Sequence, residues 1–152
     1  MGWFPLAAVV HALVRDQGWQ VVLTGAESER LLVGEVARLA GVPVISLAGR
    51  TSVDELAGVL SIAPLLITSN TGPVHIAAAT RTPVVDVYAM TNPQHQPWRV
   101  PSRVLTHPVP CAYCYKSVCP LGHHACLREI SPGEVVAAAT ELMRETEGAV
   151  HV

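Results

Sequence analysis

A strand-to-helix junction near the middle of the chain places polar groups where an anion could bind. Residues 67–79 read ITSNTGPVHIAAA, so an apolar run ends in small polar residues just before Gly72-Pro73. A helix that begins there offers unpaired N–H groups and the positive end of its dipole. Thr71 and Gly72 could meet a phosphate, which Gly72 would let approach the backbone closely. His75, in the first turn, could donate a further hydrogen bond; a histidine that packs or caps locally is the alternative.

Two glutamates follow an earlier apolar run. Glu27 and Glu29 come shortly after the run at 20–25. A carboxylate there could accept both hydroxyls of a ribose, as an acidic residue does in other nucleotide-binding α/β folds. Favourable charge in the first turn of a helix is the alternative, and we expect it to explain one of the two. Neither G-x-G-x-x-G, nor a P-loop, nor G-x-S-x-G is present, which argues against a nicotinamide-dependent dehydrogenase, a P-loop NTPase and a serine hydrolase.

All four cysteines fall within one short segment, 111–126, together with two adjacent histidines. These residues are Cys111, Cys114, Cys119, His123, His124 and Cys126. A structural zinc site needs four sulfur or nitrogen ligands, and C-x-x-C is its usual first half. Free thiols that pack an irregular loop are a second interpretation, and disulfides, which a cytoplasmic setting disfavours, are a third. Under each interpretation the expected role is structural.

The rest of the chain alternates between short apolar runs and helical spacing. The pattern predicts helices over 6–17, 27–41, 52–63, 72–81 and 131–146, and strands over 20–25, 43–49, 65–69, 83–89 and 103–107. Continuous apolar strands are typical of burial on both faces. The alternation predicts an α/β fold, a Rossmann-like parallel sheet with flanking helices and right-handed crossovers. Because ligands bind at the carboxyl ends of such strands, the loops at 25–29, 49–52 and 69–75 are the candidate site.

Composition limits the class of protein. The chain has 152 residues, half of them hydrophobic, and a net charge of -2, so we expect one globular domain over 1–152 with no electrostatic footprint for nucleic acid. No apolar run approaches the roughly 18 residues of a membrane span. The N-terminal residues lack a basic region and a cleavage site, which favours a helix over a signal peptide. We therefore expect a cytoplasmic protein.

Several segments resemble one enzyme family. LTGAESER and LAGRTSVDELAGVLSIAPLLITSNTGPVHIAAATRTPVVDVYAMTNPQHQPW resemble the C-terminal half of family 9 glycosyltransferases, the ADP-heptose:lipopolysaccharide heptosyltransferases. PCAYCYKSVCPLGHHACLREISPGEV resembles the tail of many members, so the similarity runs from about residue 3 to 143. The resemblance implies one half of a GT-B fold, the half that binds the nucleotide sugar. It also implies a role in lipopolysaccharide biosynthesis, with peripheral association at the inner membrane face as an option for the full enzyme.

The resemblance assigns roles to individual residues. Thr71, Gly72 and His75 would contact the donor's diphosphate, Glu27 and less surely Glu29 would hold the ribose, and Thr51 would lie beside the base. The catalytic contribution of this half, with His75 as its catalytic residue, would be electrostatic stabilisation of the leaving diphosphate, with no cofactor or metal required for transfer.

Three further residues complete the candidate set. Asn70 stands where members commonly carry Asp, which removes the charge from that position. His95 and Trp98, in the loop after the run at 83–89, could face the sugar; an ordinary Pro- and Asn-rich loop is the alternative.

The resemblance also implies a partner. The family's N-terminal domain, which carries the acceptor site and the catalytic base, has no counterpart in the sequence. We therefore expect the isolated chain to be inactive. Its expected partners are a nucleotide sugar and the missing N-terminal GT-B domain, or a separate chain that supplies that domain. The alternatives are a stand-alone, non-catalytic nucleotide-binding module and half of another GT-B enzyme such as a UDP-sugar epimerase.

Overall fold

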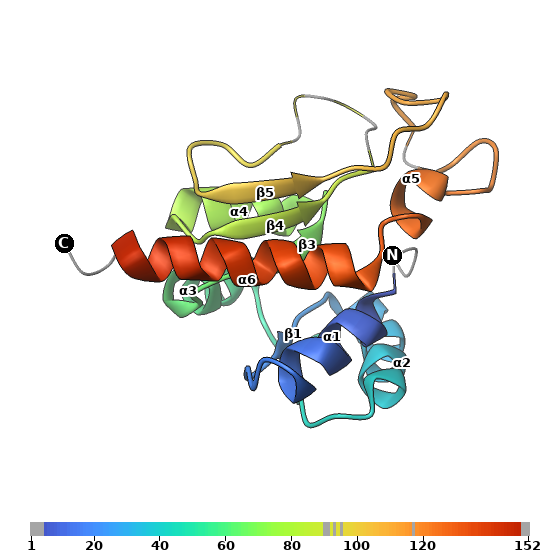
Figure 1. Cartoon of the computed structure of the whole chain (residues 1–152). Coiled ribbons are helices and arrows are strands. Elements are labelled where there is room, and N and C mark those ends of the chain that lie inside the picture. Colours follow the sequence, from blue (N-terminus) through green and yellow to red (C-terminus); the bar gives the residue numbers. More distant parts are fainter. Residues whose placement is uncertain (1–4, 90–91, 93, 95, 117, 150–152) are drawn as a thin grey trace.

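The chain folds as short parallel strands between helices (Figure 1). The computed structural model describes residues 5–89, 92, 94, 96–116 and 118–149. The helices are α1 (Leu6–Arg15), the 3-10 turn η1 (Glu27–Glu29), α2 (Arg30–Ala40), α3 (Val53–Ile62), α4 (Gly72–Thr80), α5 (Ala125–Arg128) and α6 (Pro132–Ala149). The strands are β1 (Val22–Leu23), β2 (Ile45–Ser46), β3 (Leu66–Ser69), β4 (Val84–Val87) and β5 (Ser102–Leu105).

The strands form two sheets rather than one. β1 pairs with β2, and β3, β4 and β5 pair in that order, all in parallel. The predicted parallel α/β class is therefore confirmed. β1 and β2 have only two residues each, far shorter than the predicted runs at 20–25 and 43–49.

Burial on both faces holds for β4 but is wrong for β1 and β2. All four residues of β4 are buried. Val22 of β1 and Ile45 of β2 are partners in register, and both are about two-fifths exposed, at 40% and 43%. The physical reason is coverage: Leu23, on the other face of β1, packs against α1 and α2 and is buried, whereas the Val22 face has no such layer among the described residues.

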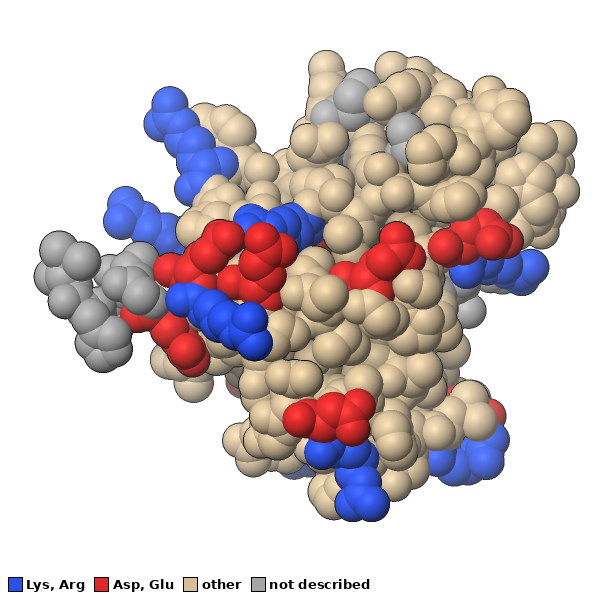
Figure 2. All heavy atoms as spheres, in the orientation of Figure 1, with Lys and Arg blue, Asp and Glu red and all other residues tan. Residues whose placement is uncertain are grey.

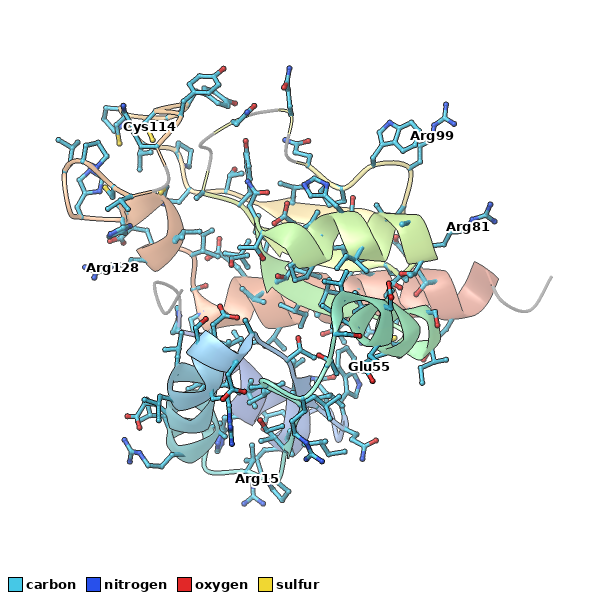
Figure 3. The ribbon with its side chains drawn as sticks, turned by 180° about the vertical axis from the view of Figure 1, so that it is seen from behind. Arg15, Glu55, Arg81, Arg99, Cys114 and Arg128 are labelled. Atoms are coloured by element: carbon cyan, nitrogen blue, oxygen red, sulfur yellow. The ribbon has the colours of Figure 1, made fainter. Side chains whose placement is uncertain are left out.

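Two helical layers cover the larger sheet. Val85 and Val87 of β4 pack on one face against α1 and α6, through Leu13 and Leu142 among others. Val84 packs on the opposite face against α3 and α4. Figure 1 shows α6 in front of the strands, and the reverse view in Figure 3 shows α3 and α4 in front of them. Two ion pairs, from Arg103 of β5 to Glu141 and Glu145, also tie this sheet to α6.

Local sequence signals explain where the helices begin. Ser52 accepts a hydrogen bond from the Glu55 amide (3.2 Å), and the Glu55 carboxylate accepts one from the Ser52 amide (2.8 Å), which is the predicted capping box. The predicted helix at 27–41 instead starts as a 3-10 turn, in which the Glu29 carboxylate accepts from the Ala26 amide at 2.7 Å. No helix among the described residues has the length and apolar character needed to cross a bilayer.

Candidate functional site

The loops after β1 and β2 are in contact. The Gly49 amide donates to the Gly25 carbonyl at 2.8 Å. Gly49 has φ +68°, a conformation that side chains disfavour, and a Cβ added there would lie 2.2 Å from Glu27 Oε2 and 2.7 Å from Arg30 Cδ. The structure therefore brings two of the three predicted loops together and packs the Glu27 side chain against the Gly49 backbone.

Glu27 and Glu29 make different contacts. Glu27 pairs with Arg30 at 2.9 Å, and both side chains are largely exposed. Glu29 closes its own turn through the Ala26 amide. Glu29 thus has the local role that was the alternative to ribose binding, whereas Glu27 presents an accessible carboxylate beside the β2 loop.

Thr71 is the N-cap of α4, and its own backbone is extended. The Thr71 hydroxyl donates to the Ser69 carbonyl at 3.1 Å instead of capping the helix. Gly72 is exposed, and a Cβ added to it would meet no atom within 4 Å. The folded chain itself therefore does not require glycine at position 72, which leaves room for a ligand against the helix terminus.

The other predicted site residues differ in their exposure to solvent. His75 is exposed on the first turns of α4, and Asn70 is half-buried beside Thr71. Thr51 is half-buried immediately before the N-cap of α3. Trp98 is 68% exposed, and the Arg99 guanidinium lies 4.6 Å from its ring centroid. His95 lies outside the described residues.

Asp86 is a residue that the sequence interpretation missed. It sits in the middle of β4, in register with Thr68 of β3 and Val104 of β5, and is 0% exposed. Neither carboxyl oxygen has a hydrogen-bond partner among the described residues, and burial raises the pKa of Asp86 to about 7. The signal was available, since a carboxylate inside the apolar run PVVDVYA is unusual.

The position of Asp86 connects it to the α4 junction. Strand alternation puts Asp86 on the same face as Val84, the face that α3 and α4 cover. Because α4 runs back from the end of β3, its amino end lies toward the carboxyl end of β4. Burial disfavours the ionised form of this carboxyl, which reduces the negative charge beneath the start of α4.

The cysteine segment forms an irregular outer loop, with Cys114 at its far end in Figure 3. All four thiols are free, and Cys111 Sγ lies 3.8 Å from His123 Nε2. Backbone N–H groups, that of His124 foremost, hold the pKa of the Cys119 thiol below its ordinary value, whereas burial raises the pKa of Cys126. Over the described residues no three such side chains are arranged to hold a metal ion.

Two surface hollows lie away from the predicted loops. One of about 520 Å³ lies between α1 and α6, and one of about 320 Å³ lies beside the turn before β1 and the start of β2. Figure 2 shows acidic and basic side chains side by side on the α6 face, with few charges over the cysteine segment.

Known proteins with similar sequences identify the family. The model of glycosyltransferase family 9 (heptosyltransferase) matches residues 6–125. Lipooligosaccharide heptosyltransferase 2 of Campylobacter jejuni is 27% identical over 141 residues, which cover 89% of this chain and 44% of that protein. Lipopolysaccharide heptosyltransferase 3 of Escherichia coli is 40% identical over 94 residues, which cover 60% and 26%.

Solved structures agree with this assignment. A glycosyl transferase of family 9 from Veillonella parvula superposes with a TM-score of 0.81 at 26% identity and covers 93% of this chain and 41% of its own. The E. coli ADP-heptose lps heptosyltransferase II superposes with a TM-score of 0.71 at 23% identity, which supports the fold. The chain spans less than half the length of these relatives. It belongs to glycosyltransferase family 9, the heptosyltransferase family.

Proposed function

We propose that the chain binds the nucleotide-sugar donor, ADP-heptose or a similar compound, for transfer of the sugar to lipopolysaccharide core or a related glycan. The observation that carries the proposal is the open start of α4. Gly72 is exposed at the positive end of this helix, and a Cβ added to it would meet no protein atom within 4 Å. The chain also belongs to a family of heptosyltransferases.

The loops after β1 and β2 support the nucleoside half of the proposal. Glu27 is accessible and lies against Gly49, so one of its oxygens can accept from ribose hydroxyls while the other stays with Arg30. Thr51, two residues after Gly49 in the same loop, would lie beside the base. The Thr71 hydroxyl would have to rotate away from the Ser69 carbonyl to donate to a phosphate oxygen.

In this proposal the chain contributes to transfer by stabilising the charge that develops on the leaving diphosphate. Backbone N–H groups at the start of α4 and the His75 ring would be the hydrogen-bond donors to that charge. Deprotonation of the acceptor would depend on residues outside this domain. The 152-residue chain by itself would therefore bind donor without transferring sugar.

Calorimetry on Gly72→Ala tests the proposal. The added methyl meets no protein atom, so the fold should be unaffected, whereas a diphosphate seated there would collide with it. We expect ADP to bind the parent chain more tightly than UDP or GDP, and Gly72→Ala to weaken ADP binding at least tenfold with an unchanged Tm.

Gly34→Ala on α2, where a Cβ also meets no atom within 4 Å, is the matched control and should bind ADP normally. Preference for UDP would favour the epimerase-like alternative. If the parent chain binds none of the three nucleotides more tightly than about 1 mM, the donor-binding proposal is wrong.

A further inference from the structure

Asp86 is a fully buried carboxyl whose two oxygens have no hydrogen-bond partner among the described residues. Its polar neighbours are engaged elsewhere. The Thr68 hydroxyl, in register with Asp86, donates to the Ser69 carbonyl at 2.9 Å. The Tyr88 hydroxyl donates to the Asn92 carbonyl. Burial raises the pKa of Asp86 to about 7, so its protonated and ionised forms are both present at neutral pH.

The Asp86 carboxyl lies beneath the first residues of α4. Val84 and Asp86 point to the same face of β4, and Val84 packs there against Ala77 of α4. Two residues along a strand advance about 6.6 Å, which is the rise of about four residues along a helix. Because α4 runs back along the strands, the residue four positions before Ala77 lies over Asp86. That residue is Pro73, which directly follows Gly72 at the helix terminus.

The elements packed around Asp86 bring few ionisable groups to its face of the sheet. Of the described residues, α4 contributes His75 and the first turn of α3 contributes Asp54 and Glu55, all three of them exposed. Arg103 of β5 points to the α6 face, where it pairs with two glutamates. The residues of β3 are not ionisable. We therefore expect the ionisation of Asp86 to respond to burial and to charge at the α4 junction.

We propose that Asp86 couples anion binding at the start of α4 to the uptake of a proton from solvent by its own carboxyl. An anion seated at Gly72 would place negative charge above a group that solvent does not reach and therefore screens little. Protonation of Asp86 relieves the repulsion, so the complex favours the protonated carboxyl more strongly than the free chain does. Asp86 thus acts through the electrostatic field at the junction, without touching the ligand.

The coupling rests on the proposed function, since it needs a donor whose diphosphate lies at this helix terminus. It gives donor binding a defined pH dependence. Because the complex holds the proton more tightly than the free chain, affinity is highest where Asp86 is protonated and falls as the pH rises above its pKa of about 7. A phosphate group loses its last proton near pH 6, so its own ionisation does not cause a fall in this range.

Calorimetry of ADP binding, in buffers that differ in ionisation enthalpy, measures the proton uptake. We expect about half a proton to be taken up per ADP at pH 7.5 if the pKa of Asp86 rises by about one in the complex. The same rise lowers the affinity about fivefold between pH 7 and pH 9. Asp86→Asn should remove the uptake and should bind ADP equally well at both pH values.

Asp54→Asn, on the exposed first turn of α3, is the matched control and should keep the uptake and the pH dependence. Uptake that persists in Asp86→Asn would overturn the proposal. Uptake that is lost in His75→Gln but not in Asp86→Asn would assign the proton to the histidine and would overturn it too. If Asp86→Asn does not fold, Asp86→Val removes the same carboxyl and continues the apolar run of β4.

A measurement without nucleotide separates the coupling from donor binding. In the ligand-free chain, the carboxyl carbon of Asp86 should titrate by NMR with a pKa well above the ordinary value of about 4. Titration at or below that value would overturn the coupling whatever the chain binds. ADP binding without proton uptake would overturn the coupling alone, whereas a chain that does not bind ADP would overturn both proposals.

Discussion

At the scale of single residues, Asp86 and His75 represent opposite kinds of functional candidate. His75 is exposed on α4, so we expect its replacement to change ligand affinity more than stability. Asp86 is fully buried without a hydrogen-bond partner among the described residues, which is costly for an ionised carboxyl. Each therefore predicts a different measurement, affinity for His75 and stability for Asp86.

Replacing His75 by Ala should weaken ADP binding about tenfold, the order of one hydrogen bond to a charged group. The Tm should stay within a degree or two, since the side chain is exposed. His75→Gln, which keeps an N–H donor, should recover most of the affinity in the same calorimetric titration. A large loss of stability with unchanged affinity would instead show that His75 serves packing.

Asp86 should make the protein less stable as the pH rises. The pKa is about 7 in the folded chain, against about 4 in an unfolded one, so the folded state binds the extra proton between these values. The free energy of unfolding then falls from about pH 4 to pH 7, by up to about 4 kcal/mol. Asp86→Asn removes this titration and should exceed the parent in stability at pH 8 much more than at pH 5.

Urea unfolding at pH 5 and pH 8 measures the difference, with Asp54→Asn on the exposed first turn of α3 as the control. A parent and an Asp86→Asn variant with parallel stability profiles would show that Asp86 is ionised and satisfied in solution.

At the scale of elements, the proposed function places ligand binding at the junctions between strands and helices, which the helices hold in position. α4 has small residues along most of its length and lies close to the strands, with Val74 and Ala77 fully buried. The contact of Gly49 with Glu27 fixes the loop after β2 against the loop after β1. Perturbing one junction should therefore change binding without unfolding the domain.

Gly49→Ala separates conformation from contact. Its positive φ costs about 1 kcal/mol for alanine, and its methyl would also displace the flexible Glu27 and Arg30 side chains. Gly41→Ala has a similar φ, +62°, with no atom within 4 Å, and is the matched control. We expect similar losses of Tm in both variants but weaker ADP binding only in Gly49→Ala. Equal affinities would remove Glu27 from the ribose site.

The cysteine segment should show unequal thiol reactivity. The lowered pKa of Cys119 gives it more thiolate at neutral pH than Cys126, whose pKa is raised by burial. Iodoacetamide labelling followed by peptide mass spectrometry should modify Cys119 first, and its rate should level off at a lower pH. Protection of all four cysteines that a chelator abolishes would support the zinc interpretation instead.

At the scale of the whole molecule, α1 links the apolar clusters of the two sheets, because Val10 packs with Leu23 of β1 and with α2, whereas Leu13 packs with β4 and α6. Leu13 of α1 and Leu142 of α6 belong to the same buried cluster, together with residues of β4. Both sheets should therefore unfold in one cooperative transition despite the absence of a shared ladder among the described strands.

Leu13→Ala tests this connection. The side chain is 4% exposed, so its truncation should cost about 2–5 kcal/mol, and the small and large sheets should lose stability together. Leu31→Ala on α2, 92% exposed, should change the free energy of unfolding by less than about 0.5 kcal/mol. Separate transitions for amides of β1 and β4 in native-state hydrogen exchange would contradict the link through α1.

The sequence predicted local features better than distant ones. The β3–α4 junction was predictable because Gly72-Pro73 sets the start of a helix directly after an apolar run, and the Ser52–Glu55 cap because its two residues are neighbours. The exposed face of β1 and the separation of the sheets were not, since both depend on which elements pack from far along the chain. Asp86 could have been found from its residue type alone.

The packing of Glu27 on Gly49 has a consequence for how this family can diverge. Any side chain at position 49 must displace the carboxylate at position 27, so position 49 cannot gain a side chain without a change at position 27. Homologues that lose glycine at 49 should carry a shorter residue at 27, and their preference among nucleoside diphosphates should shift along with it. The residues at positions 49 and 27 should thus vary together with the donor that each group of homologues uses.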